Sequence, residues 1–359
     1  MKKIFLFLAA ASLVGIAACN KTDSVQSPVL PEQQGEGQIT FSLAPSDGDV
    51  PMTRAVTAYT TAQTYESKVN KVQILIFSAD GKLAAYKDNG TALTGTISTT
   101  AGTKTVWAVI NGPSLASVST LSAFQATALD LSANSTNANT GFVMAGSTSC
   151  NVTTTGTVPC NISVSRLVSR VALVQVTNAL PPVYGTMKVE RIFLANVVGN
   201  QNFSGNASPS TWYNKDGRAD ETTRNAAHII DGSTYKASCE DLTYKSVAQT
   251  VNNGASYNPS ALLFYSFPNS STTAPAGFAS SFAAKRSVLT VVATVDGKIQ
   301  YYPVVLDSAV LERNKTYTVG LTITGPGSDD PNKPVEKGSV NITLTVAGWV
   351  AGATYDETI

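Results

Sequence analysis

The sequence predicts an all-β fold of two β-sandwich domains with short helices, preceded by a lipoprotein signal peptide. The chain has 359 residues, which exceeds one ordinary domain and favours two behind a leader. Apolar and polar residues alternate along many short segments, the pattern of strands with one buried face. Asp-Gly and Asn-Gly dipeptides stand between several of these segments and predict tight turns. Together these observations are typical of sandwiches.

Composition excludes several classes of function. Only 14% of the residues are charged, and 25 Lys and Arg against 24 Asp and Glu leave a net charge of +1, so nucleic acid is not expected as a partner. His228 is the only histidine. Multi-histidine metal sites and Ser-His-Asp triads would all depend on it. No carboxylate pair, nucleophile elbow or phosphate loop stands out, so we expect no enzyme activity, cofactor or metal.

The N-terminus has the pattern of an export signal. Met1-Lys2-Lys3 precedes the apolar run Ile4 to Ala10, which is too short to span a membrane. Ile16-Ala17-Ala18-Cys19 resembles a bacterial lipobox, in which the Cys19 thiol is acylated before cleavage. The alternative is an ordinary signal peptide that happens to end in cysteine. Residues 20–37 are rich in Pro, Gln, Glu, Ser and Gly and predict a flexible spacer between lipid and fold.

The first half of the chain predicts several strands and one helix. The helix is expected over residues 115–129, where apolar residues recur at spacings of three and four after Asn111-Gly112-Pro113. The expected strands are Ile39, Phe41 and Leu43 with their polar neighbours, Val72 to Ile76 leading into Asp80-Gly81, Val106 to Ile110, and Val171 to Val176.

Three cysteines remain after Cys19. Cys150 and Cys160 flank a nine-residue segment of the kind that turns a hairpin, and an exported chain meets an oxidising compartment, so a disulfide between them is expected. The alternative is two independent buried thiols. Cys239 has no assigned role.

The second half begins at Leu180-Pro181-Pro182, which interrupts the strand pattern and predicts the domain boundary. Asp296-Gly297 predicts a second hairpin. The C-terminal end alternates twice, from Tyr317 to Ile323 and again at Val340, Ile342, Leu344 and Val346, followed by Trp349 as a packing anchor. The Gly- and Pro-rich residues 325–334 between the two runs predict an exposed linker, so the last strand could leave its own domain.

Several of these segments resemble the major fimbrial subunits, or fimbrillins, of Bacteroidales bacteria, which build type V pili. The resemblance is strongest from Leu311 to Gly327 and from Val340 to Val350. The leader around Cys19 and the segment Pro51-Met52-Thr53-Arg54-Ala55-Val56 are also similar. Weaker matches extend it over most of the chain, at Asn70 to Phe77, Phe142 to Gly146 and Tyr302 to Val304.

The resemblance implies two sandwiches of transthyretin-like topology and assembly by strand exchange. A lipoprotein precursor would reach the outer membrane, and an Arg-specific protease would cut between Arg54 and Ala55. The removed strand would carry Ile39, Phe41 and Leu43, and the donor strand from the next copy would carry Val340, Ile342, Leu344, Val346 and Trp349. The implied division is signal peptide 1–18, propeptide 19–54, sandwiches 55–179 and 180–325, and linker with donor strand 326–359.

The sequence-based hypothesis is therefore a structural subunit of a cell-surface fimbria that supports adhesion. Its implied partners are other copies of itself, accessory and anchor subunits, the protease, the outer membrane through the lipid, and host or bacterial surface receptors. The alternatives are a fimbrial tip, accessory or anchor subunit, or a surface glycan-binding lipoprotein. The alternating last strand argues against a tip and the Thr-Arg-Ala site against an anchor. The last strand could also simply pair within its own domain.

Overall fold

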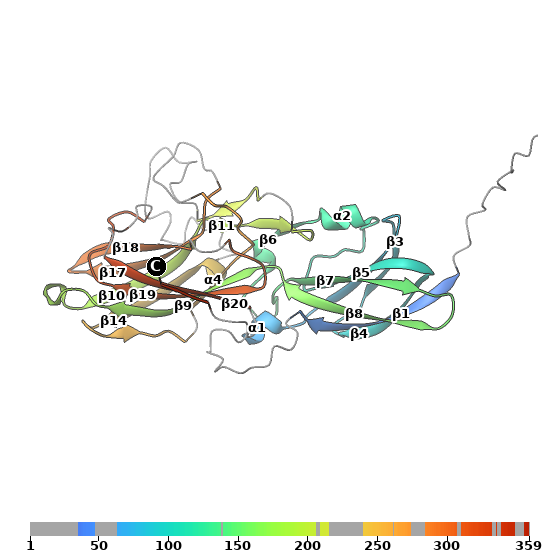
Figure 1. Cartoon of the computed structure of the whole chain (residues 1–359), viewed down its shortest axis with the longest axis horizontal. Helices are drawn as coiled ribbons and strands as arrows, with labels where there is room; N and C mark the ends of the chain where they lie inside the picture. The colour runs from blue at the N-terminus through green and yellow to red at the C-terminus, as the bar shows by residue number, and fades with distance from the viewer. Residues whose placement is uncertain are drawn as a thin grey trace, which may run out of the picture. The chain divides into compact units, whose positions relative to one another are not determined.

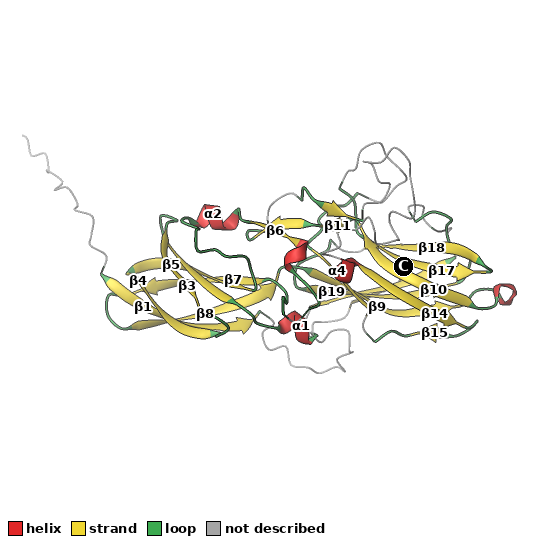
Figure 2. Ribbon diagram, turned by 180° about the vertical axis from the view of Figure 1, so that it is seen from behind, coloured by secondary structure: helices red, strands yellow, loops and turns green. Residues whose placement is uncertain are grey.

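The computed structural model describes residues 35–46, 63–137, 139–205, 209–214, 240–260, 262–273, 284–306, 310–331, 335, 339–348 and 355–358. Cys19, Arg54, Ala55, His228, Cys239 and Trp349, all singled out in the sequence, lie outside these ranges. Residues from Gly35 onward form one compact unit. Strands dominate this unit and its helices are short (Figure 2).

The first sandwich is built from seven strands in the order β3-β2-β5-β7-β8-β1-β4 (Figure 1). Buried and exposed residues alternate along the first strand and along β8, as expected for a sheet that covers a core on one side. The strands are β1 (Glu36–Pro45), β2 (Val72–Ser78), β3 (Leu83–Asp88), β4 (Thr94–Thr100), β5 (Gly102–Ile110), β7 (Met144–Val152) and β8 (Thr157–Arg166).

The second sandwich joins a four-stranded sheet, β14-β10-β17-β18, to a sheet of order β15-β9-β19-β20-β21 in which β16 also pairs with β9. Most of its core residues are aliphatic, and the largest cluster of buried apolar side chains includes them. The strands are β9 (Ser169–Asn178), β10 (Met187–Ala195), β14 (Tyr244–Val251), β15 (Ser256–Tyr257), β16 (Leu262–Ser266), β17 (Val288–Val295), β18 (Lys298–Val305), β19 (Lys315–Ile323), β20 (Val340–Gly348) and β21 (Tyr355–Thr358).

Short elements connect these sheets. Two small two-stranded sheets pair β6 with β12 and β11 with β13. Their bounds are β6 (Ala128–Asp130), β12 (Asn200–Asn202), β11 (Val197–Val198) and β13 (Trp212–Tyr213). The helices are α1 (Thr64–Ser67), α2 (Leu121–Gln125) and α4 (Glu240–Thr243), with 3-10 turns η1 (Leu131–Ala133) and η2 (Pro182–Tyr184). Within the described residues, none of the helices is long and apolar enough to cross a membrane.

Both predicted Asp-Gly hairpins form. The turn between β2 and β3 has Gly81 at φ +80°, and the turn between β17 and β18 has Asp296 at φ 48° and Gly297 at φ 71°. Two consecutive positive φ values match the twist of the flanking strands, and Asp-Gly adopts them at little cost. The all-β class and the two sandwiches are thus confirmed, together with the strands predicted around Ile39, Val106 and Tyr317.

Three local expectations differ from the structure. The helix expected over residues 115–129 is only the five-residue α2, because Leu129 lies in β6 and pairs with Gln201. The sheet pairings place the change of sandwich between β8 and β9, before the expected boundary at residue 180, since β9 pairs with β19. The expected linker is partly docked: Ser328 forms a backbone bridge with Tyr301 of β18.

Candidate functional site

The first strand, β1, lies inside its sheet rather than at an edge. It pairs antiparallel with β4, where Ile39 faces Ile97, and parallel with β8, where Phe41 faces Cys160. Both rows of its backbone groups are therefore used in ladders. Removing β1 would leave unpaired N–H and C=O groups on both β4 and β8, which is the arrangement that favours the entry of another strand.

Three apolar side chains of β1 fill the core of the first sandwich. Ile39 and Phe41 have no exposed surface and Leu43 is 6% exposed, while Thr40 and Ser42 face solvent. Full burial of such side chains stabilises by roughly 1.5–3 kcal/mol each, so the three contribute at most roughly 5–9 kcal/mol. We use the term β1 groove for the space that β1 occupies between β4 and β8. Because β1 contributes this much buried apolar surface to the core, the β1 groove is the candidate functional site.

Glycines make room for β1 at two points. A Cβ on Gly95 of β4 would lie 2.8 Å from Cζ of Phe41, so a side chain here would displace the Phe41 ring. On β1 itself, a Cβ on Gly37 would lie 2.3 Å from the backbone oxygen of Thr153 and 2.5 Å from Cγ1 of Val152. Carbon atoms do not approach other atoms this closely, so the Gly37 position accepts no side chain.

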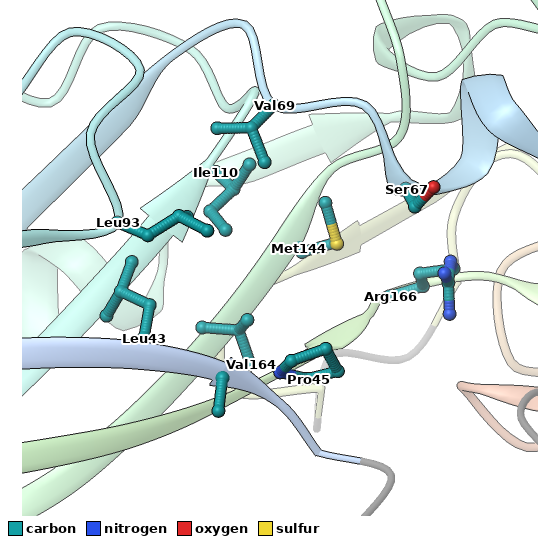
Figure 3. A pocket seen from close by; sticks show the side chains of 10 residues that line it. Leu43, Pro45, Ser67, Val69, Leu93, Ile110, Met144, Val164 and Arg166 are labelled. Carbon is teal, nitrogen blue, oxygen red and sulfur yellow. The ribbon is translucent and has the colours of Figure 1, made fainter.

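An apolar cavity of about 110 Å³ continues the β1 groove beyond Leu43 (Figure 3). Leu43 and Pro45 of β1 form one side of it, and Met144 of β7 and Arg166 of β8 lie across from them. The other lining residues are Ala44, Ser67, Val69, Leu93, Ile110 and Val164. Most of these residues belong to elements other than β1, so most of the wall does not depend on β1.

The disulfide expected from the sequence is present between Cys150 of β7 and Cys160 of β8, with an S–S distance of 2.06 Å. Cys160 is buried in the same core cluster as Ile39 and Phe41, and Cys150 packs against that cluster. Residues 144 and 145 of β7 pair with residues 165 and 166 of β8 only at the other end of the two strands. The disulfide therefore holds β8, one wall of the β1 groove, where the two strands lack ladder hydrogen bonds.

Residues 63–67, which follow Arg54 in the sequence, are fastened to the second sandwich through Glu66. Both carboxylate oxygens of Glu66 accept hydrogen bonds from Nη1 of Arg170 in β9, at 3.1 and 2.8 Å. The hydroxyl of Tyr265 in β16 donates to Glu66 at 2.6 Å. Glu66, Arg170 and Tyr265 have no exposed surface. A buried carboxylate is tolerated only with such partners, so this cluster fixes residues 63–67 in place.

Burial and the adjacent carboxylate also act on the tyrosines of this cluster. Burial raises the pKa of Tyr265 well above its usual value, and the negative charge of Glu66 raises it further. Burial likewise raises the pKa of Tyr65, whose hydroxyl lies 3.0 Å from that of Tyr265. Both hydroxyls therefore stay protonated as hydrogen-bond donors at neutral pH.

The last long strand, β20, is less deeply buried in the second sandwich than β1 is in the first. It pairs antiparallel with β19 over nine residues and with the four-residue β21 on its other side. Of its apolar residues, Leu344 is 5% exposed, whereas Val340, Ile342 and Val346 are only partly buried. In the described molecule β20 thus occupies its own domain, the alternative left open by the sequence.

The structure brings together some of the residues predicted for the site. Ile39, Phe41, Leu43 and the Cys150–Cys160 pair share one core cluster, while the donor residues from Val340 to Val346 belong to another. Gly37, Glu66 and Arg170 were missed. An arginine inside the apolar run Ser169 to Leu173 was the available signal for the Glu66 partner. In the described ranges, no group of three or more His, Cys, Asp or Glu side chains is placed to hold a metal ion.

The fold and the site define an all-β protein of two sandwiches in which an N-terminal strand completes the first core. Residues 38–179, which include most of β1, match the family model described as major fimbrial subunit protein (FimA). Over these residues the chain is similar to the major fimbrial subunit family. A curated relative, the major fimbrium subunit FimA type-2 of Porphyromonas gingivalis, is 49% identical over 41 residues, which is 11% of either chain.

Solved structures share the fold along most of the chain. A Bacteroides eggerthii protein provisionally assigned to cell adhesion has a TM-score of 0.60 at 18% identity, covering 88% of this chain and 96% of its own. A fimbrilin (FimA) from Porphyromonas gingivalis has a TM-score of 0.57 at 16% identity, with coverages of 89% and 99%. At these identities the likeness concerns the fold alone.

Proposed function

We propose that this protein is a structural subunit of a cell-surface fimbria that polymerises by strand exchange and supports adhesion. The precursor is attached to the outer membrane through a lipid on Cys19. An Arg-specific protease cuts between Arg54 and Ala55, β1 leaves, and β20 of another copy enters the β1 groove. Accessory and anchor subunits and surface receptors are the further partners of the assembled extracellular fimbria.

One observation carries this proposal: a chain-terminal strand completes the core of the first sandwich. β1 is buried through Ile39, Phe41 and Leu43, and Arg54 stands in the sequence between β1 and the next described element, α1. A cut after Arg54 severs β1 from the rest of the domain without breaking any described strand. The Glu66–Arg170 pair then keeps the new N-terminal segment attached by residues 63–67.

The physical chemistry of an emptied groove favours exchange between copies. The alternating strand β20 has apolar residues at the same two-residue spacing as β1, so it can satisfy the same ladders and fill the same core positions. Four aliphatic side chains contribute at most roughly 6–12 kcal/mol on full burial. A copy that accepts at one end of the chain and donates at the other forms a non-closing interface, which produces an open filament.

The test is the state of the protein in fibres sheared from cells. We expect a mature N-terminus at Ala55 and a ladder of SDS-resistant oligomers on gels of unheated samples. Arg54→Ala should retain the longer N-terminus and abolish the ladder, whereas Lys71→Ala, which changes a basic residue outside the loop, should leave both unchanged. Deletion of residues 340–359 should give processed protein without a ladder.

Other outcomes would distinguish the alternatives. Unprocessed monomer in fibre-bearing cells would contradict the proposal. Processed protein that accepts a strand but is found only at fibre ends would indicate a tip subunit. Retention of Cys19 and its lipid in the fibre would indicate an anchor.

A further inference from the structure

We propose that the β1 groove excludes any side chain at the Gly37 position, which we call the stop. The stop allows an incoming β20 strand only one register for each strand direction, and this register places a valine in the cavity beyond Leu43. This proposal rests on the strand exchange proposed above. It assigns an occupant to the cavity of Figure 3, namely the side chain of a second copy of this chain.

The stop is a property of the walls that remain when β1 leaves. The close contacts of a Cβ at the Gly37 position are made by Thr153 and Val152, at the end of β7 and the turn that follows it. The nearer of these, at 2.3 Å, is a backbone oxygen, which cannot rotate away as a side chain does. A strand that spans the β1 groove must therefore present glycine at this point, as β1 does.

The sequence of the donor segment meets this condition in only one way for each strand direction. The apolar residues Val340, Ile342, Leu344 and Val346 occupy one face, and continuing this two-residue spacing reaches Gly338 before them and Gly348 after them. If β20 runs in the direction of β1, Gly338 takes the Gly37 position; if it runs in the opposite direction, Gly348 does.

A two-residue slip fails in every case. With the direction of β1, it places Glu336 or Val340 at the Gly37 position; with the opposite direction, it places Val346 or Val350 there. All four carry a Cβ. A one-residue slip places the polar face of β20, including Asn341 and Thr343, in the core. The glycine condition thus leaves a single register for each direction.

In that register β20 supplies one more apolar side chain than β1. Three of its four residues replace Ile39, Phe41 and Leu43, and the fourth, a valine, takes the place of Pro45 at the edge of the cavity. Leu93, which also lines the cavity, is 41% exposed. A valine seated here covers apolar surface that β1 leaves open.

Engineered disulfides between copies can report this register. On the solvent face, Oγ1 of Thr40 lies 3.5 Å from Oγ1 of Thr96, so a residue that replaces Thr40 lies beside Thr96. In the proposed register this residue is Asn341 for the direction of β1 and Thr345 for the opposite direction. A two-residue slip brings Thr343 to this place in one sense, in either direction, and Ser339 or Ala347 in the other sense. In the unassembled chain β4 and β20 belong to different sheets.

We would combine Thr96→Cys with Asn341→Cys, Thr343→Cys or Thr345→Cys in full-length chains that also carry Cys239→Ser. Sheared fibres are oxidised with copper phenanthroline and analysed on reducing and non-reducing gels after boiling. We expect a disulfide-linked ladder with either Asn341→Cys or Thr345→Cys, at least fivefold stronger than with Thr343→Cys. A ladder strongest with Thr343→Cys would overturn the register while leaving strand exchange intact.

The parent chain with Cys239→Ser alone separates this result from a failure of the proposed function. If it forms no SDS-resistant oligomers before boiling, strand exchange itself is contradicted, and the register falls with it. If it forms them and none of the three pairs forms a ladder, strand exchange stands and the register is overturned, since neither Asn341 nor Thr345 then lies beside Thr96.

A second test concerns the cavity. Leu93→Ser should lower the temperature at which SDS-resistant oligomers dissociate, while the unprocessed monomer, in which this side chain is exposed, keeps its melting temperature within about 2 °C. Val183→Ser is the matched control, because Val183 is 85% exposed and does not line the cavity. Equal oligomer stability of the two variants would overturn the seating of a valine beside Leu93.

Discussion

β1 and β20 have the same alternating pattern but are held to different depths. Ile39 and Phe41 of β1 are completely buried, whereas Ile342 and Val346 of β20 keep part of their surface exposed. β1 pairs with β4 over seven residues and with β8 over eight, while β20 pairs with β19 over nine residues and with β21 over only four. Periodicity therefore identifies both strands, but it does not measure how firmly each is held.

The difference suits the two roles that we propose. A deeply buried strand dissociates slowly, and the proposed cut after Arg54 would make its loss irreversible. A shallowly packed strand leaves its domain at lower cost. The docked Ser328 lies twelve residues before Val340, and twelve extended residues reach at most roughly 40 Å, so β20 can move while the chain before it stays attached.

The largest expected effect comes from truncating one buried side chain in each of the two strands of the unprocessed chain. Phe41→Ala should lower the free energy of unfolding by roughly 3–5 kcal/mol, because it leaves a cavity in the core of the first sandwich. Leu344→Ala should cost about 2 kcal/mol, since the neighbouring residues of β20 are half-exposed and the site can relax. Urea denaturation followed by circular dichroism measures both values.

Outward-facing residues of the same strands serve as controls for this comparison. Thr40→Ala and Thr343→Ala should each change the free energy of unfolding by less than about 1 kcal/mol. Equal losses for Phe41→Ala and Leu344→Ala would show that the two strands are held equally, contrary to the difference in their burial.

A smaller effect is expected from the disulfide that supports the β1 groove. The double substitution Cys150→Ser and Cys160→Ser should destabilise the first sandwich by about 2–3 kcal/mol, because it removes a cross-link that closes a loop of ten residues. Limited proteolysis should then cut the first sandwich sooner and the second at an unchanged rate. Cys239→Ser is the control, and a similar loss of stability with this variant would contradict the assignment.

The last expected effect is confined to alkaline pH and concerns the second sandwich. Burial raises the pKa of Tyr302 in β18 and of Tyr317 in β19 to about 12. In the unfolded chain tyrosines ionise near pH 10, so the unfolded state loses protons first as pH rises. The stability of the second sandwich should therefore be constant below about pH 10 and fall between pH 10 and 12.

Thermal melts across this pH range test the prediction. Tyr317→Phe should flatten the alkaline decline, although it removes the hydrogen bond from the Tyr317 hydroxyl to the Val310 oxygen and so lowers the melting temperature at pH 7. A decline as steep as that of the unsubstituted protein would contradict a contribution from Tyr317. Because β19 holds β20, release of β20 should become easier over the same range.

Much of the fold could be predicted from the sequence, because strand patterns and turn dipeptides are local. The alternation around Ile39 and Tyr317 and the Asp296-Gly297 turn all correspond to observed elements. The helix expected over residues 115–129 did not form beyond α2, since Leu129 gains a strand partner in Gln201 that no local pattern reveals. The pairing of β9 with β19 joins segments far apart in the chain, so no local pattern such as Leu180-Pro181-Pro182 reveals it.

The site divides in the same way. The sequence by itself determined which strands have one apolar face, which cysteines are close enough to pair, and where a protease could find an arginine, because these depend on neighbouring residues. Only the tertiary structure decided that β1 lies between β4 and β8, that Glu66 pairs with Arg170 and that Gly37 faces the Thr153 oxygen. These contacts join segments up to 119 residues apart, and spacing along the chain carries no information about them.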